Sequence, residues 1–190
     1  MKKLSFCLLI IFCSLKTYSQ EDYYIKGQDT IRVSNLTYDL TMQSYLAELS
    51  YTDTNGKPVT VKGRKNLSDV STLYINYVTI DKIPQKAHKP KGYVKWAHRV
   101  VYGKLIVDYY TNSMTTSRAG SRPVTTSITK FFIKMPDGTF YDIRKSKDRK
   151  KHIIPYLQQC SEFVSAYDGN YSSDYKSFTE MILLYNSLCK

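Results

Sequence analysis

The sequence lacks the short patterns that identify most enzymes. It contains no nucleophile elbow of the G-x-S-x-G kind, no H-E-x-x-H helix and no glycine-rich phosphate loop. Its three histidines, His88, His98 and His152, never lie two or four residues apart, so no two of them have the spacing of metal ligands. We therefore expect no catalytic residue, no cofactor and no metal. Two enzyme hypotheses stay open: a hydrolase with a pair of carboxylates that meet only in the fold, and a site centred on His98.

Long hydrophobic runs are also scarce, and the one that is present extends from Leu4 to Leu15. It has about 12 residues, whereas a membrane-spanning helix needs about 20. Lysines precede the run and small residues follow it up to Ser19, which is the three-part layout of a secretory signal peptide. We predict that residues 1–19 are a signal peptide, that the protein is exported, and that it has no transmembrane anchor. A lipoprotein attached through Cys13 and an uncleaved anchor are the alternatives.

Cysteine is rare, with four in the chain, and the predicted cleavage leaves only Cys160 and Cys189. Two cysteines in an exported protein predict a disulfide bond. The bond would close a loop of about 29 residues, which the chain-entropy model values at about 3–4 kcal/mol. The two cysteines do not form a C-x-x-C pair and have no histidine at ligand spacing, so a redox-active pair and a metal site are both disfavoured.

Acidic residues are few, 16 against 28 lysines and arginines, and the formal net charge is +12. Loss of Lys2, Lys3 and Lys16 with the signal peptide would remove three positive charges and leave +9. A basic exported protein is expected to meet anionic lipid headgroups, acidic glycans or an envelope protein. Nucleic acid is a weaker expectation because the chain leaves the cytoplasm. The alternative is that the charge serves solubility alone.

Two segments concentrate the positive charge, residues 86–99 and residues 144–152. The first interleaves lysines with Tyr93 and Trp96, an arrangement that suits the stacking of sugars or bases. The second would place several cations on one side of a helix, where they could engage phosphate or sulfate groups. A solvated basic face remains the alternative for both. The residues expected to bind an anionic surface are Lys89, Lys91, Lys95, Arg144, Lys147, Lys150 and Lys151.

Residues 23–144 are rich in tyrosine and β-branched residues that alternate with polar ones, which predicts strands joined by turns. Asp-Thr-Asn-Gly at 53–56, Asn-Tyr at 76–77 and Pro-Asp-Gly at 136–138 predict hairpin turns. Residues 112–123 have no apolar period and are expected to form a long loop.

After residue 144 the apolar period changes from two to 3.6, which predicts helices. A first helix is expected over 147–159, with a kink or break near His152 because Pro155 lacks a backbone N–H. A short helix near Phe163 and a third over 174–188 follow. The sequence thus predicts an α+β protein, mainly an antiparallel sheet that forms a partial barrel or a sandwich. Two to three helices over about 146–190 complete a single domain of residues 20–190.

Four segments together resemble a widespread group of small exported proteins of Bacteroidetes-type bacteria that have no assigned function. They are KMPDGTFYDI at 134–143, IPYLQQC at 154–160, YNSLC at 185–189 and GKLIVDYY at 103–110. The resemblance covers most of the mature chain and rests on turns, core strands and the cysteine pair. It implies the periplasm or cell surface of a Gram-negative bacterium, supports the disulfide, and implies no catalytic residue.

The sequence therefore indicates an exported envelope protein that is a non-enzymatic binding module with a basic surface. The alternatives are a small-ligand carrier in which the sheet forms a cup, and a hydrolase.

Overall fold

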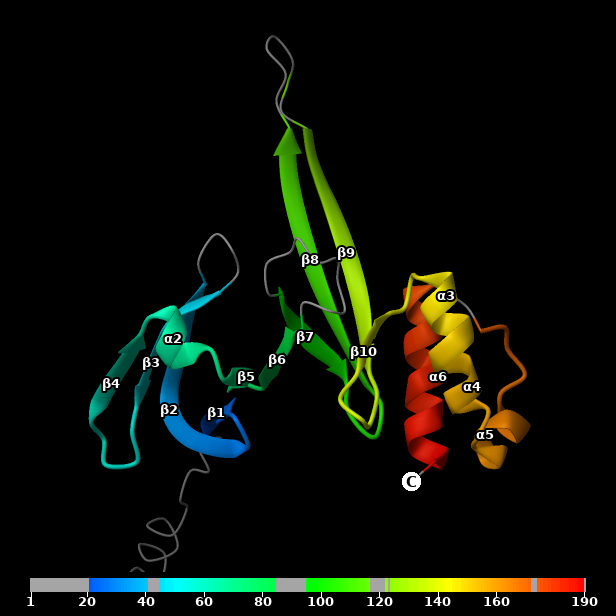
Figure 1. The fold of residues 1–190 in the computed structure, drawn as a ribbon, viewed down its shortest axis with the longest axis horizontal. Coiled ribbons are helices and arrows are strands. Elements are labelled where there is room, and N and C mark those ends of the chain that lie inside the picture. Colours follow the sequence, from blue (N-terminus) through cyan, green and yellow to red (C-terminus); the bar gives the residue numbers. More distant parts are fainter. Residues whose placement is uncertain are drawn as a thin grey trace, which may run out of the picture.

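In the computed structural model the described residues are 21–40, 45–84, 95–116, 122, 124–171 and 174–189. They form one ten-stranded antiparallel sheet, in the order β10-β9-β8-β7-β6-β5-β1-β2-β3-β4, with helices at its β10 end (Figure 1). The predicted α+β class is confirmed, and the sheet is open. The predicted signal peptide lies outside the described residues. The strands are β1 (Asp22–Lys26), β2 (Asp29–Leu40), β3 (Leu46–Thr52), β4 (Pro58–Lys62), β5 (Val70–Ile75), β6 (Val78–Ile83), β7 (Lys95–Val101), β8 (Ile106–Thr116), β9 (Val124–Lys134) and β10 (Phe140–Asp142).

The first half of the sheet is built from hairpins whose turns the sequence predicts. Asp53 accepts backbone hydrogen bonds on its side chain from Asn55 and Lys57, at 2.9 and 2.8 Å, and so organises the β3–β4 turn. Asn76 and Tyr77 both have positive φ angles, 48° and 69°, as a two-residue β5–β6 hairpin requires. The short helix α2 (Arg64–Leu67), which the sequence analysis did not predict, covers this end of the sheet. The cluster that it helps to bury consists of Tyr24, Val33, Leu36, Leu46, Leu49, Leu67, Val70, Leu73, Ile80 and Trp96.

The prediction of a loop over 112–123 is wrong in part. Strand β8 continues to Thr116 and β9 begins at Val124, and the two pair without interruption from Ile106–Lys134 to Thr116–Val124. The outer part of this hairpin stands away from the rest of the protein (Figure 1), and residues 125–128 are exposed. A strand whose side chains stay exposed, as they do at 125–128, needs no apolar alternation, and the sequence at 112–116 also lacks this pattern.

The described residues after residue 145 form three helical stretches. The first runs without a break through α3 (Ser146–Asp148), a π-helical turn η2 (Arg149–Ile153) and α4 (Ile154–Leu157). In place of the predicted kink or break, the helical stretch contains the wider π-helical turn η2. This turn accommodates the Pro155 ring, which would clash with the preceding turn of a regular α-helix. The others are α5 (Ser161–Ala166) and α6 (Tyr175–Leu188), and the Asp174 side chain caps α6 by accepting a hydrogen bond from the Ser177 backbone N–H at 3.1 Å.

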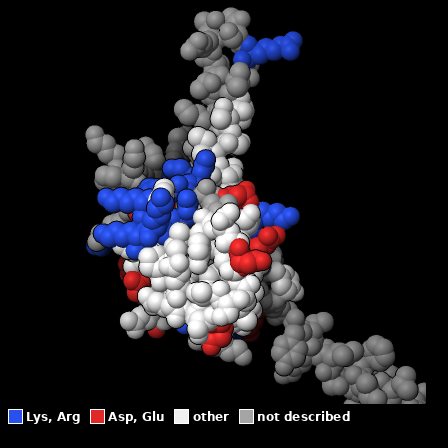
Figure 2. Space-filling view, turned by 90° about the vertical axis from the view of Figure 1, so that its right-hand side faces the viewer, with Lys and Arg blue, Asp and Glu red and all other residues white. Residues whose placement is uncertain are grey.

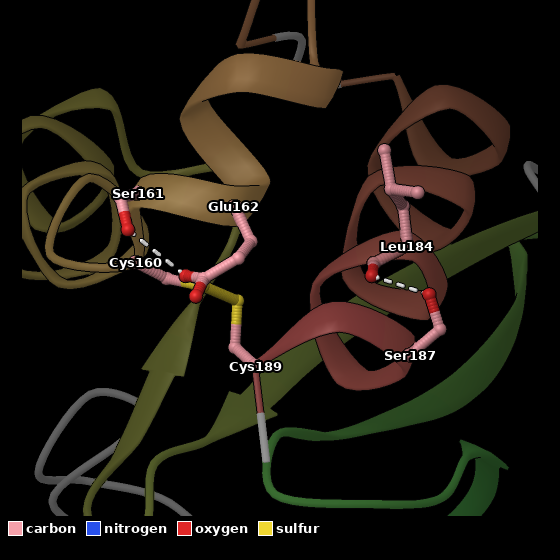
Figure 3. The surroundings of a disulfide bond; sticks show 6 residues. All are labelled: Cys160, Ser161, Glu162, Leu184, Ser187 and Cys189. Atoms are coloured by element: carbon pink, nitrogen blue, oxygen red, sulfur yellow. Dashed lines mark hydrogen bonds between the residues drawn. A yellow bond between two sulfur atoms is a disulfide. The ribbon is translucent and has the colours of Figure 1, made fainter.

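These helices bury a second apolar cluster against β7, β8 and β9. Its largest fully buried members include Phe163 and Phe178 from the helices and Ile133 from β9. The predicted disulfide between Cys160 and Cys189 is confirmed, with an S–S distance of 2.01 Å and a Cα–Cα distance of 6.1 Å. It links the residue before α5 to the residue after α6 (Figure 3), so the ends of the two helices are joined covalently.

A polar contact also attaches α6 to the sheet. The Asn186 side chain accepts from the Leu105 N–H at 2.9 Å and donates to the carbonyls of Leu105 and Tyr102, at 2.7 and 3.1 Å. Gly103 lies in this turn at φ 137°, and a β-carbon there would come within 2.6 Å of the Asn186 amide nitrogen. The segments 103–110 and 185–189, which are distant in sequence, therefore meet here.

Candidate functional site

The second basic segment, residues 144–152, leads from β10 into the first helical stretch. Arg144, Lys147, Lys150 and Lys151 are all exposed, and the last three lie on α3 and η2. Figure 2, which looks at the helical end of the molecule, shows Lys and Arg atoms gathered on one side. We call Arg144, Lys147, Lys150 and Lys151 the basic face. Four of the seven predicted anion-binding residues thus lie exposed in this one segment.

The opposite side of the same segment anchors it to the sheet. Arg149 is half-buried and donates a hydrogen bond from Nη1 to the Ile143 carbonyl at 2.7 Å. The ring of His152 stacks on Tyr141 of β10, with centroids 4.7 Å apart and planes 11° apart, and Ile153 is fully buried. Because Arg149, His152 and Ile153 face inward, Lys150 and Lys151, which lie between Arg149 and His152, point outward.

The acidic residues near the basic face do not neutralise it. Within the described part of the chain, no Asp or Glu forms an ion pair with Lys147, Lys150 or Lys151. Asp148 is 3.9 Å from Lys145 instead, and Arg144 donates to the Thr129 carbonyl at 3.3 Å. Three ammonium groups on adjacent turns therefore lack a carboxylate partner among the described residues.

A groove of about 450 Å³ adjoins the basic face. It lies between the β9–β10 turn, β10 and the start of α3, and the residues that line it include Phe140, Tyr141, Lys145 and Asp148. Lys145 and Asp148 give the groove polar groups of both charges.

The remaining predicted anion-binding residues are not part of this face. Lys95 begins β7, where its ammonium group donates to the Tyr110 hydroxyl at 3.0 Å and lies 4.6 Å from the centre of that ring. Lys89 and Lys91 lie outside the described residues.

A buried charged cluster lies within the sheet, in a place that the sequence analysis did not identify. Arg99 of β7 binds Asp81 of β6 through two hydrogen bonds of 2.7 and 2.8 Å, and Thr72 donates to the same carboxylate at 2.7 Å. Asp108 of β8 pairs with Arg99 in register, so its side chain lies on the same face of the sheet. An aspartate inside the apolar stretch from Leu105 to Tyr110 was the available signal in the sequence. Only the strand register shows which residues lie beside it.

This cluster is a carboxylate pair, as the open hydrolase hypothesis requires, but it is sealed. Asp81 is 2% exposed and Asp108 is 0% exposed, so a substrate cannot reach either carboxylate. Burial, followed by the negative charge of Asp81, raises the pKa of Asp108 from 3.8 to about 8. Neither Asp108 oxygen accepts a hydrogen bond from the described residues, which agrees with a carboxyl group that keeps its proton at neutral pH. The geometry supports a structural role for this pair.

The His, Cys, Asp and Glu side chains of the described residues do not gather in any group of three or more that could hold a metal ion. None of the helices in this part of the chain has the length and apolar character needed to span a membrane. No protein-family model, no curated protein and no solved structure matches the chain.

Proposed function

We propose that the protein is an exported, non-enzymatic module of the bacterial envelope that binds anionic groups through its basic face. The observation that carries the proposal is that Lys147, Lys150 and Lys151 are exposed and lack acidic partners in the described part of the chain, while Arg149 and His152 anchor the same helical stretch. Flexible surface lysines lose side-chain entropy when they bind. Lysines on anchored backbone need to order only their own side chains.

The proposed ligand chemistry is a phosphate or other acidic group presented repeatedly on a surface. Lysine ammonium groups bind such groups as point charges without strict geometry, so a polyanion suits three neighbouring lysines better than a single small ion. Anionic lipid headgroups attract each basic residue near the membrane surface with a free energy of about 1 kcal/mol. A second source of such groups is an acidic glycan, whose polar groups could enter the groove that Lys145 and Asp148 help to line.

The test compares two variants of equal net charge. In the first, Lys147, Lys150 and Lys151 are changed to Glu. In the matched control, the exposed residues Lys26, Lys57 and Lys65, which lie at the other end of the chain, are changed to Glu.

Binding is measured to vesicles that contain phosphatidylglycerol and, separately, to an immobilised acidic polysaccharide, over a range of salt concentrations. We expect binding of the unmodified chain that weakens steeply with salt, a loss of at least about tenfold in the first variant, and a smaller loss in the control. Preference for vesicles identifies lipid headgroups and preference for the polysaccharide identifies a glycan. Equal losses in the two variants would refute the proposal, because only total charge would then matter.

A further inference from the structure

A small pocket lies beside α2, in the part of the sheet that holds the first apolar cluster. Its volume is about 140 Å³, close to that of an engineered protein cavity of about 150 Å³ that binds benzene. It is bounded by α2, the start of β3, and the neighbouring strands β6 and β7. Its apolar walls come from Tyr45, Leu46, Leu67 and the indole ring of Trp96.

Three N–H donor side chains also line this pocket. Trp96 is 7% exposed, and its indole N–H is buried without a hydrogen-bond partner among the described residues. A buried donor without an acceptor costs about 1–3 kcal/mol, so such a group in a pocket wall indicates a missing acceptor. Lys82 lies directly opposite Trp96 in the register of β6 and β7, which places both side chains on the same face of the sheet.

The two cationic side chains are held in place by contacts that leave donors for a ligand. The guanidinium group of Arg64 lies 3.8 Å from the centre of the Tyr45 ring, and no Asp or Glu among the described residues pairs with it. The Lys82 ammonium group donates one hydrogen bond, of 2.5 Å, to the Ser68 carbonyl. Burial lowers the pKa of Lys82, and the nearby Asp69 carboxylate opposes that shift. An anion in the pocket would compensate the partly desolvated ammonium group.

We infer that this pocket binds a small organic anion, with a carboxylate or similar group held by Arg64, Lys82 and the Trp96 N–H, and a compact apolar body between Tyr45, Leu46 and Leu67. The site is independent of the basic face, because it lies in the other apolar cluster and uses other residues.

Trp96 is the only tryptophan in the chain, so its indole N–H gives a single resolved signal in a proton–nitrogen correlation spectrum. The probe is benzoate, and benzamide, which has the same shape and no charge, is the matched neutral compound. We expect benzoate to move the indole signal in a saturable way and benzamide to move it weakly. The titration extends to about 10 mM at constant ionic strength, since a 1 mM Kd corresponds to about −4 kcal/mol.

Two substitutions of equal charge separate the pocket from general electrostatics. Arg64→Gln removes a pocket cation, and Lys65→Gln removes the adjacent exposed cation of α2, which does not line the pocket. We expect Arg64→Gln to weaken benzoate binding by about tenfold, as the loss of one charge-assisted hydrogen bond predicts, and Lys65→Gln to leave it unchanged. No movement of the indole signal with benzoate, equal movement with benzamide, or equal effects of the two substitutions would each overturn the inference.

Discussion

Replacement of Asp108 by asparagine should make the protein more stable at alkaline pH, although it removes a charged residue from the core. Asn has nearly the shape of a protonated carboxyl group and cannot ionise. Its amide can donate a hydrogen bond toward Asp81, as the protonated acid can. The variant therefore always has a neutral side chain at position 108, which the buried site favours. It cannot form the ionised side chain, which burial penalises.

The magnitude follows from the raised pKa of Asp108. Between pH 3.8 and about 8 the folded chain holds a proton on Asp108 that the unfolded chain has released. The contribution of Asp108 to the free energy of unfolding must then fall as pH rises through this window, by up to about 1.4 kcal/mol per pH unit. Four pH units set a ceiling of about 6 kcal/mol for the penalty, which is reached above the folded-state pKa and is absent near pH 4.

The assay is urea unfolding of both proteins at several pH values from 4 to 8.5, with the disulfide intact. All other titrating groups are shared, so the difference in unfolding free energy isolates Asp108. We expect no resolved difference near pH 4 and a more stable variant by a few kcal/mol near pH 8. Asp29→Asn, at an exposed strand position, is the matched control and should show no such trend. A constant difference, or a less stable Asn variant at pH 8, would refute the burial argument.

Three further predictions concern the attachment of the helices. Gly103→Ala should lower the free energy of unfolding by at least about 2 kcal/mol, because Gly103 has a φ of 137° and a β-carbon there would clash with Asn186. Urea unfolding measures this loss. The control Gly63→Ala should cost less, because Gly63 has positive φ but open space around it. Asn186→Ala should cost about 2–3 kcal/mol in the same assay, because it leaves three backbone groups of the β7–β8 turn without this partner; a loss under about 0.5 kcal/mol would contradict the role of this side chain. Replacement of Cys160 and Cys189 by serine should lower stability by about 3–4 kcal/mol, and an unchanged urea midpoint would show that the closed loop contributes nothing.

Much of the fold could be predicted because local chemistry determines it. The turn at Asp53, the Asn76–Tyr77 hairpin and the cap at Asp174 each depend on residues within a few positions of one another. The disulfide could be predicted because the proposed mature chain offers only one pairing. In each of these places, the residues that form the turn, cap or disulfide are the same residues that form the recognisable sequence pattern.

The incorrect and missing predictions depend on surroundings that are distant in sequence. Residues 112–116 form a strand without apolar alternation, because hydrogen bonds to β9 are sufficient to extend the hairpin. Asp81, Arg99 and Asp108 lie on three strands, and only the register of those strands brings them together. Arg149 looked like its basic neighbours in sequence, but the helical stretch turns it inward to the Ile143 carbonyl.

The most direct test of the proposed function is a lysine footprint on the protein from residue 20 onward, the proposed mature chain. Exposed lysines are acetylated with and without phosphatidylglycerol vesicles or the acidic polysaccharide, and the modified sites are quantified by mass spectrometry. We expect the bound partner to protect Lys147, Lys150 and Lys151 from acetylation. Lys26, Lys57 and Lys65 should keep their original reactivity. Uniform protection, or protection confined to the second group, would contradict the claim that the basic face is the binding surface.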